Sequence, residues 1–87
     1  MQKALQEMNA AEQKEEKQRE KEELLTAQDY FRRGFRASSE GHTQEAVKEY
    51  SKAIELDPSF ASAYHNRGIL YNKLGEQQKA LDDYNKA

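Results

Sequence analysis

The sequence has no cysteine, no tryptophan and a single proline among its 87 residues. Without cysteine the chain can build no disulfide framework, no thiolate zinc site and no thiol nucleophile. It also has no apolar run near the ~20 residues of a membrane-spanning helix, and its first residues lack the apolar core of a secretion signal. These absences predict a soluble, cytoplasmic protein, and the short length allows at most one domain.

An excess of one charge is also missing. Acidic residues outnumber basic residues by only two, and from residue 27 onward the chain has nine of each, so no global field attracts nucleic acid. The aromatic residues recur at the spacing of a helical core rather than beside a basic stripe, which argues against base stacking. Only 36% of the residues are hydrophobic, so the core must be small. We expect neither a nucleic-acid partner nor a membrane partner.

Groups for catalysis or metal binding are scarce. His42 and His65 are the only histidines. His42 falls in a predicted turn, and His65 has no carboxylate or histidine three or four residues away. Asp82 and Asp83 are adjacent, so they do not face each other on a helix, and we interpret both as solvated. No glycine-rich phosphate loop or metal-ligand spacing occurs. The sequence therefore predicts no enzyme activity, no catalytic residue and no cofactor or metal.

What the chain does contain is an internal repeat. When the sequence is shifted by 34, residues 27–53 overlie residues 61–87, and ten of the 27 positions are identical. The identical pairs are Ala27/Ala61, Tyr30/Tyr64, Arg33/Arg67, Gly34/Gly68, Gly41/Gly75, Gln44/Gln78, Ala46/Ala80, Tyr50/Tyr84, Lys52/Lys86 and Ala53/Ala87. A fixed period of this length is typical of stacked repeats, in which one unit buries its apolar face only against a neighbour.

The repeated glycines indicate helix packing and turns. Gly34 and Gly68 fall inside helical segments, where glycine costs roughly 1 kcal/mol relative to alanine, so we predict a second helix close against each. Gly41 and Gly75 fall where a helix end needs a residue that tolerates positive φ. Pro58 stops a helix because the residue before proline leaves the α region. The first predicted helix ends at residue 39. The other three span residues 44–56, 60–74 and 77–87, and Thr43 is the predicted N-cap of the helix at 44–56.

These features resemble the tetratricopeptide repeat (TPR) family. The residues that carry the resemblance are Tyr64, Arg67, Gly68 and Tyr71, the pairs Ala46/Tyr50 and Ala80/Tyr84, and Pro58. Departures are Arg33 and Arg67, where the family usually has Leu, and Ala37, where it prefers Tyr. The resemblance implies an all-α fold of antiparallel helix–turn–helix repeats, an α-solenoid. Residues 27–60 would be the first repeat and residues 61–87 a truncated second repeat.

The segment before the repeats has a different composition. Residues 1–23 are rich in Gln, Glu and Lys and contain no Gly, Pro or β-branched residue, which gives strong helix propensity. After Leu5 and Met8 no large apolar residue follows until Leu24, so the heptad positions of a coiled coil are missing. A solvated helix, a helix that pairs with itself or a partner, and disorder remain open. Nothing after Leu24 breaks a helix, so we expect a helical extension, residues 1–26, that continues into the first repeat helix.

The resemblance implies a protein–protein interaction module, a scaffold or adaptor without catalysis. It would bind a peptide or helix of a partner on the concave face that the first helix of each repeat lines. Carried over by position, the partner-binding residues are Gln28, Phe31, Phe35, Ser38, Ser62, His65, Asn66, Ile69, Asn72 and Lys73. The alternative is self-association, in which the truncated repeat and the long helix drive a homodimer or a higher homo-oligomer.

Two phenylalanines narrow the choice of partner. Family members that hold the acidic tails of chaperones carry a Lys and an Asn in their first helix, and Phe31 and Phe35 take those places here. Asn66 matches the second-repeat Asn of that clamp, but alone it cannot hold a carboxylate, so we do not expect chaperone-tail binding. The phenylalanines indicate an apolar groove, or a surface that another helix of the chain covers.

Three arginines form the one basic cluster of the repeat region. Arg32 and Arg36 are one helical turn apart and share a face. They are placed to bind an acidic peptide or a phosphate. The alternative is a solvated face whose charge Asp29 and Glu40 balance.

Overall fold

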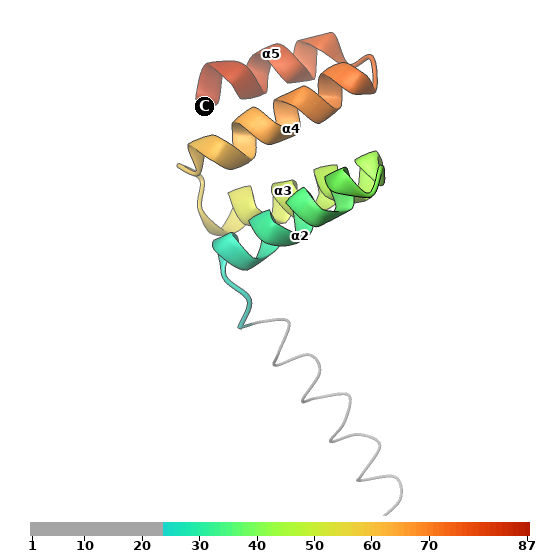
Figure 1. Cartoon of the computed structure of the whole chain (residues 1–87). Coiled ribbons are helices and arrows are strands. Elements are labelled where there is room, and N and C mark those ends of the chain that lie inside the picture. Colours follow the sequence, from blue (N-terminus) through green and yellow to red (C-terminus); the bar gives the residue numbers. More distant parts are fainter. Residues whose placement is uncertain (1–23) are drawn as a thin grey trace, which may run out of the picture.

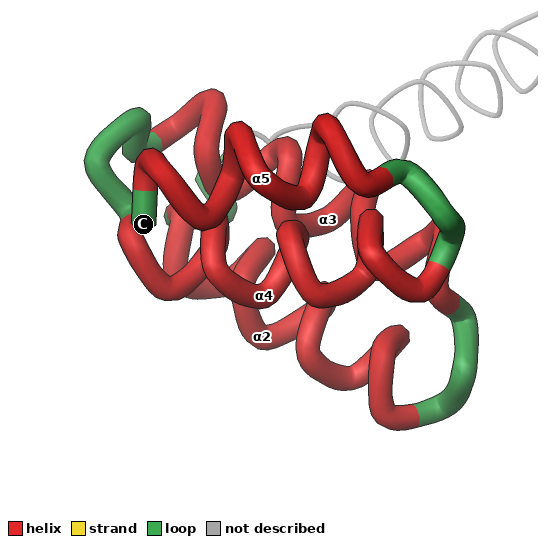
Figure 2. The backbone as a smooth tube through the Cα atoms, turned by 90° about the horizontal axis from the view of Figure 1, so that it is seen from above, coloured by secondary structure: helices red, strands yellow, loops and turns green. Residues whose placement is uncertain are grey.

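The computed structural model describes residues 24–87, which form two antiparallel helical hairpins stacked on each other (Figure 1). The helices are α2 (Ala27–Ser39), α3 (Thr43–Leu56), α4 (Ala61–Lys73) and α5 (Gln77–Lys86). α3 packs against α2 and α4, and α5 packs against α4. Seen from above, α2 and α4 lie on one side and α3 and α5 on the other (Figure 2). The predicted all-α pair of helix–turn–helix units is confirmed.

The start of α2 differs from the prediction. Thr26 has an extended backbone, with φ −86° and ψ 168°, and it caps the helix in a reciprocal capping box. The Asp29 N–H donates to Thr26 Oγ1 at 3.2 Å, and the Thr26 N–H donates to Asp29 Oδ2 at 2.9 Å. The backbone hydrogen bond, followed by the one from the Thr26 hydroxyl, lowers the pKa of Asp29 because both favour the carboxylate. The prediction that one helix runs unbroken into the first repeat is therefore wrong, because the backbone at Thr26 is not helical. The part of that prediction that concerns residues 1–23 lies outside the described residues.

The turns inside the hairpins follow the glycines. Gly41 has φ 81° and Gly75 has φ 77°, so both occupy the left-handed region as predicted. α3, however, already includes Thr43, and the N-cap position belongs to His42, whose side chain makes no capping hydrogen bond. The prediction of Thr43 as N-cap is wrong by one residue, because the chain enters the helix directly after the glycine turn.

The two helical glycines are packing contacts, as predicted. A Cβ on Gly34 would lie 2.8 Å from the ring of Tyr50, across the α2–α3 hairpin. A Cβ on Gly68 would lie 2.7 Å from the ring of Tyr84 and 3.3 Å from the backbone oxygen of Ala80, across the α4–α5 hairpin. Each hairpin therefore closes an aromatic ring of its second helix directly onto the backbone of its first.

The core lies where α4 packs on the first hairpin, and Tyr50 is at its centre with 1% of its surface exposed. The Phe31 ring packs against Tyr50 with centroids 5.4 Å apart, and Phe60 stacks on Phe31 at 5.0 Å. Small residues allow the helices to approach closely, and those that are fully buried are Ala46, Ala53 and Ala63. The aromatic side chains fill the space between these helices.

A buried ion pair joins the second hairpin and contradicts one prediction. Arg67 donates to Asp83 through Nε at 2.8 Å and Nη2 at 2.7 Å, and through Nη1 to the Ser51 hydroxyl of α3 at 3.1 Å. Asp83 is 3% exposed, so its interpretation as solvated is wrong: it points inward to the arginine of the neighbouring helix. The hydrogen bonds with Asp83 raise the pKa of Arg67 further, and the Tyr64 and Tyr71 rings flank the guanidinium at 5.6 and 5.5 Å.

Candidate functional site

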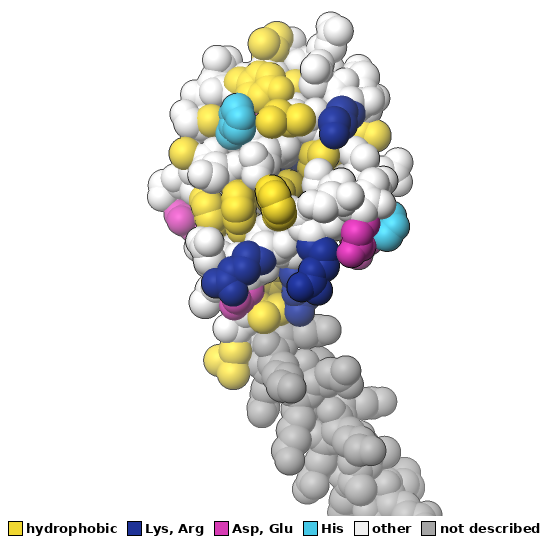
Figure 3. Space-filling model, in the orientation of Figure 1, with side chains coloured by type: hydrophobic (Ala, Val, Ile, Leu, Met, Phe, Trp, Pro, Cys, Tyr) yellow, Lys and Arg dark blue, Asp and Glu magenta, His cyan; other side chains and the backbone are white. Residues whose placement is uncertain are grey.

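The side of the molecule formed by α2 and α4 carries the candidate site. Figure 3 shows hydrophobic side chains gathered across this face, with most of the Lys and Arg side chains below them and acidic side chains beside these. α2 and α4 together contain five basic residues and one acidic residue, whereas α3 and α5 contain four basic and five acidic residues. The repeat region is balanced as a whole, but its first helices are positive.

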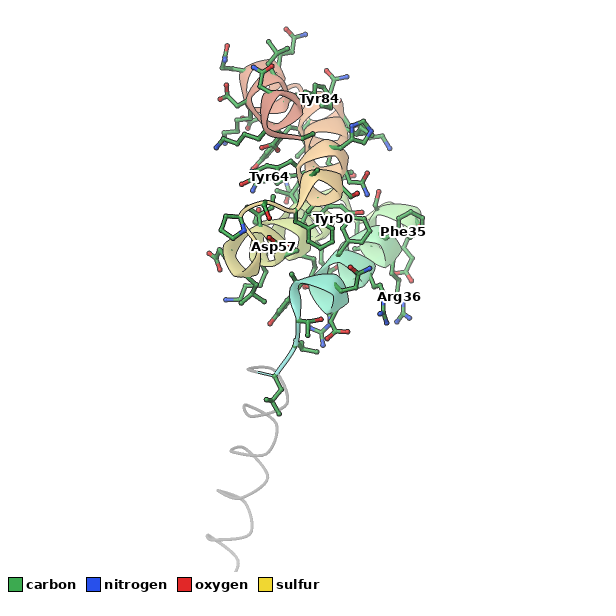
Figure 4. All side chains as sticks on the ribbon, turned by 90° about the vertical axis from the view of Figure 1, so that its left-hand side faces the viewer. Phe35, Arg36, Tyr50, Asp57, Tyr64 and Tyr84 are labelled. Carbon is green, nitrogen blue, oxygen red and sulfur yellow. The ribbon has the colours of Figure 1, made fainter. Side chains whose placement is uncertain are left out.

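A pocket of about 460 Å³ opens on this face, and all its lining residues belong to α2. They are Gln28, Phe31, Arg32, Phe35 and Arg36. Phe35 is 61% exposed, and in Figure 4 it projects with Arg36 away from the packed helices, whereas Tyr50 lies between the hairpins. An exposed phenylalanine beside a pocket is an anchor point for an apolar group of a partner. We call these five residues the α2 pocket.

Phe31 has a structural role as well as a place in the pocket. It is half-buried, since its ring is held between Tyr50 and Phe60. Its remaining surface forms one wall of the α2 pocket, next to Phe35. This wall of the pocket is therefore held by ring contacts of the core, which position it before a ligand arrives.

The predicted partner-binding residues divide into two groups. Gln28, Phe31 and Phe35 meet in the α2 pocket, and the others lie outside it. Those outside are Ser38 on α2 and Ser62, His65, Asn66, Ile69, Asn72 and Lys73 on α4. Asn66 donates to Tyr50 Oη at 3.4 Å, and the His65 ring lies 5.9 Å from the ring of Tyr84, so both also contact their own chain. Their role in binding stays a prediction.

The two arginines of the pocket, Arg32 and Arg36, form no ion pair with the part of the chain that the structure describes. The acids expected to balance them make other contacts: Asp29 caps α2, and Glu40 lies 3.7 Å from Nδ1 of His42. They still lie near the arginines, because the charge of Arg32, after the hydrogen bonds of the capping box, helps to lower the pKa of Asp29, and Glu40 lines a hollow with Arg36. Both guanidiniums are exposed and can accept an anion from outside. Arg32 and Arg36 are absent from the binding residues predicted by family position. The signal that indicated them in the sequence is their spacing of four residues, which puts two basic side chains on one helix face.

The described part of the chain offers no other chemistry at this face. Residues 24–87 contain no group of three or more His, Asp or Glu side chains that could hold a metal ion. In the same residues no helix has the length and apolar character needed to cross a membrane. The α2–α4 face is therefore described by its shape, its exposed ring and its charge.

The comparisons with known proteins agree with this fold. A model of the TPR repeat matches residues 39–75. Tetratricopeptide repeat protein 36 of Xenopus tropicalis is 39% identical over 64 residues, which are 74% of this chain and 32% of that protein. The chain belongs to the tetratricopeptide repeat family. TPR domains are generally protein-interaction modules.

Two further matches show the same repeat in larger proteins. The crystal structure of MamA superposes with a TM-score of 0.69 at 31% identity, over 70% of this chain and 36% of that one. A probable UDP-N-acetylglucosamine–peptide N-acetylglucosaminyltransferase SPINDLY of Oryza sativa is 38% identical over 47 residues. Those residues are 54% of this TPR chain but 5% of the rice protein. The chain thus spans from a twentieth to about a third of these proteins, and none of their activities is carried over.

Proposed function

We propose that this chain is a protein–protein interaction module that binds a peptide or helix of a partner on the face of α2 and α4, with the α2 pocket as its anchor. The single observation that carries the proposal is the exposed ring of Phe35 at the pocket. An aromatic side chain left open at a preformed hollow loses contact with water only when a partner covers it. The chemistry is binding alone, and the chain acts as a scaffold or adaptor.

The test is a selection of peptide ligands in which the natural partner need not be identified. The full chain is immobilised and used to select peptides from a displayed random library, and the affinity of each selected peptide is measured by fluorescence anisotropy. Replacing Phe35 with alanine should weaken binding by about tenfold or more, because a buried phenylalanine contributes about 1.5–3 kcal/mol. Phe35 is exposed, so the variant should fold like the wild type.

A matched control comes from the other side of the molecule. Leu81 lies on α5 and is 55% exposed, so Leu81→Ala removes a similarly exposed apolar side chain outside the α2–α4 face. Peptides that bind the pocket should bind Leu81→Ala with unchanged affinity. If Phe35→Ala leaves the affinity of the peptides unchanged and Leu81→Ala lowers it, the binding site is on α5 and the proposal is wrong.

Self-association is a second candidate, favoured by the outer surface of the second hairpin. Val47 and Tyr50 of α3 are covered by α4, and one period later Leu81 and Tyr84 of α5 occupy the same positions. Tyr84 contacts α4 on one side, and within residues 24–87 Leu81 and Tyr84 remain 55% and 39% exposed. A second copy of the chain placed on α5 would bury this surface, as α4 buries the surface of α3.

Sedimentation equilibrium across a hundredfold concentration range tests this second candidate. If copies associate through α5, the apparent mass should rise above the 10.1 kDa of one chain as concentration increases. Leu81→Asp should hold the mass at the monomer value, because a charge in an apolar contact is costly. A wild-type mass that stays near 10.1 kDa throughout would exclude self-association at these concentrations.

A further inference from the structure

We propose that the α2 pocket selects an acidic peptide: an apolar side chain of the ligand contacts Phe31 and Phe35 while flanking carboxylates pair with Arg32 and Arg36. This inference rests on the proposed function and names the class of partner. The pocket supplies both halves of the recognition, since two of its five lining residues are aromatic and two are arginines.

The charge around the pocket favours an acidic ligand. No acidic residue of the described range 24–87 lines the pocket, and α4, which shares this face, contains no acidic residue. The one acid of α2, Asp29, already accepts hydrogen bonds from Thr26 at the helix start. Within residues 24–87 neither Arg32 nor Arg36 forms an ion pair that a ligand carboxylate would have to break. Nearby acids act without a direct ion pair: the charge of Arg32, after the Thr26 hydrogen bonds, helps to lower the pKa of Asp29, and Arg36 also lines a neighbouring hollow with three glutamates. The described lining residues carry two positive charges and no negative charge, although the whole chain is negative by two charges.

The placement of the arginines fits two separate carboxylates better than one phosphate. Side chains one helical turn apart start about 5–6 Å from each other at Cβ, so each guanidinium can take its own anion. A single phosphate would need several donors that converge on it, commonly with help from a helix N-terminus. The N-terminus of α2 is closed by the capping box of Thr26 and Asp29. We therefore commit to carboxylates of Asp or Glu.

The apolar half sets where the ligand sits. Phe35 alone would attract any apolar peptide, and the arginines alone would attract any anion. Together they require an apolar side chain with acidic residues on either side of it, which is a more specific pattern than either half gives. Arg33 offers a comparison on the same helix, because it does not line the α2 pocket but a neighbouring hollow. Arg36 borders that hollow as well. The acidic residues of that hollow are Glu40, Glu45 and Glu49.

The experiment uses the full chain and three labelled peptides of matched length. In the first a leucine is flanked by glutamates, in the second glutamines replace the glutamates, and in the third phosphoserines replace them. By fluorescence anisotropy at low salt, the glutamate peptide should bind about tenfold tighter than the glutamine peptide, and the preference should shrink at high ionic strength. Arg32→Gln should weaken the glutamate peptide several-fold and leave the glutamine peptide unchanged, whereas Arg33→Gln should alter neither.

Each contrary result has one meaning. Equal binding of the glutamate and glutamine peptides, an Arg33→Gln effect as large as that of Arg32→Gln, or no binding of either peptide would overturn the acidic-peptide inference. Tighter binding of the phosphoserine peptide than of the glutamate peptide would assign the pocket to phosphopeptides instead. If the glutamine peptide binds as well as the glutamate peptide but Phe35→Ala still weakens both, the inference fails while the proposed function stands. If Phe35→Ala changes neither peptide, the proposed function fails as well.

Discussion

Replacing Asp83 with alanine is expected to lower the free energy of unfolding by about 3–5 kcal/mol, the cost of removing one partner from a buried ion pair. Arg67 would stay between α3, α4 and α5 with only the Ser51 hydroxyl as a hydrogen-bond acceptor. Small domains have total stabilities of about 5–15 kcal/mol, so much of the folded population could be lost. Urea unfolding followed by circular dichroism, with wild type and variant both in sucrose, keeps the transition measurable.

Two comparisons separate the ion pair from a general effect of charge. Asp82 is the exposed neighbour of Asp83, and its carboxylate accepts a hydrogen bond from Gln78 at 3.2 Å, so Asp82→Ala should change stability by no more than about 0.5 kcal/mol. Replacing Arg67 and Asp83 together with leucine removes both charges and should cost far less than Asp83→Ala. Equal effects of Asp83→Ala and Asp82→Ala would show that the pair does not stabilise the fold.

The sequence could predict that Arg67 recurs but not what it pairs with. Arg33 and Arg67 are one period apart, and so are Glu49 and Asp83. Only the second pair forms within residues 24–87, and a buried oxygen of Glu49, Oε2, has no hydrogen-bond partner. In the first hairpin there is no described preceding helix to supply a hydroxyl as Ser51 does for Arg67. The pairing depends on three helices at once, which spacing along one helix does not contain.

The fold itself was largely predictable because its signals are local. The period of 34 residues, the turn glycines and the small-to-large pairs gave the number and order of the helices in residues 27–87. The start of α2 was missed, although Thr26 and Asp29 have the spacing of a capping box. The charged segment before Thr26 has high helix propensity, which predicted that the helix would extend through Thr26. Propensity alone does not determine where a helix begins when a capping residue favours a start further along the chain.

The sequence predicted some of the residues that line the candidate site but not all of them, because the direction of each side chain depends on how the helices pack. Family position identified Gln28, Phe31 and Phe35, which do line the α2 pocket. It could not show that the predicted binding residues of α4 lie outside the pocket, because that depends on how far apart the stacked helices hold their exposed faces. Arg32 and Arg36 enter the pocket from positions beside the family's usual ones, and only the structure shows that no acid of residues 24–87 pairs with them.

The two helical glycines have the same place in their repeats but differ in what surrounds the ring they contact. Tyr50 is 1% exposed, packs against Phe31 and accepts a hydrogen bond from Asn66, so its ring has no direction in which to move away from Gly34. Tyr84 is 39% exposed, so its ring can turn toward solvent away from Gly68. The same substitution should therefore have unequal effects at the two sites.

Gly34→Ala is expected to destabilise the chain by about 1–3 kcal/mol, because its Cβ would lie 2.8 Å from the trapped ring of Tyr50. The gain of roughly 1 kcal/mol in helix propensity offsets only part of that overpacking. Gly68→Ala gains the same propensity against a ring that can yield, although the Ala80 oxygen at 3.3 Å limits the relief, so its net effect should be near zero. Urea midpoints of the two variants, measured side by side, decide the comparison. A Gly68→Ala variant that is less stable than Gly34→Ala would show that ring mobility does not govern the contact and that the backbone approach to Ala80 does.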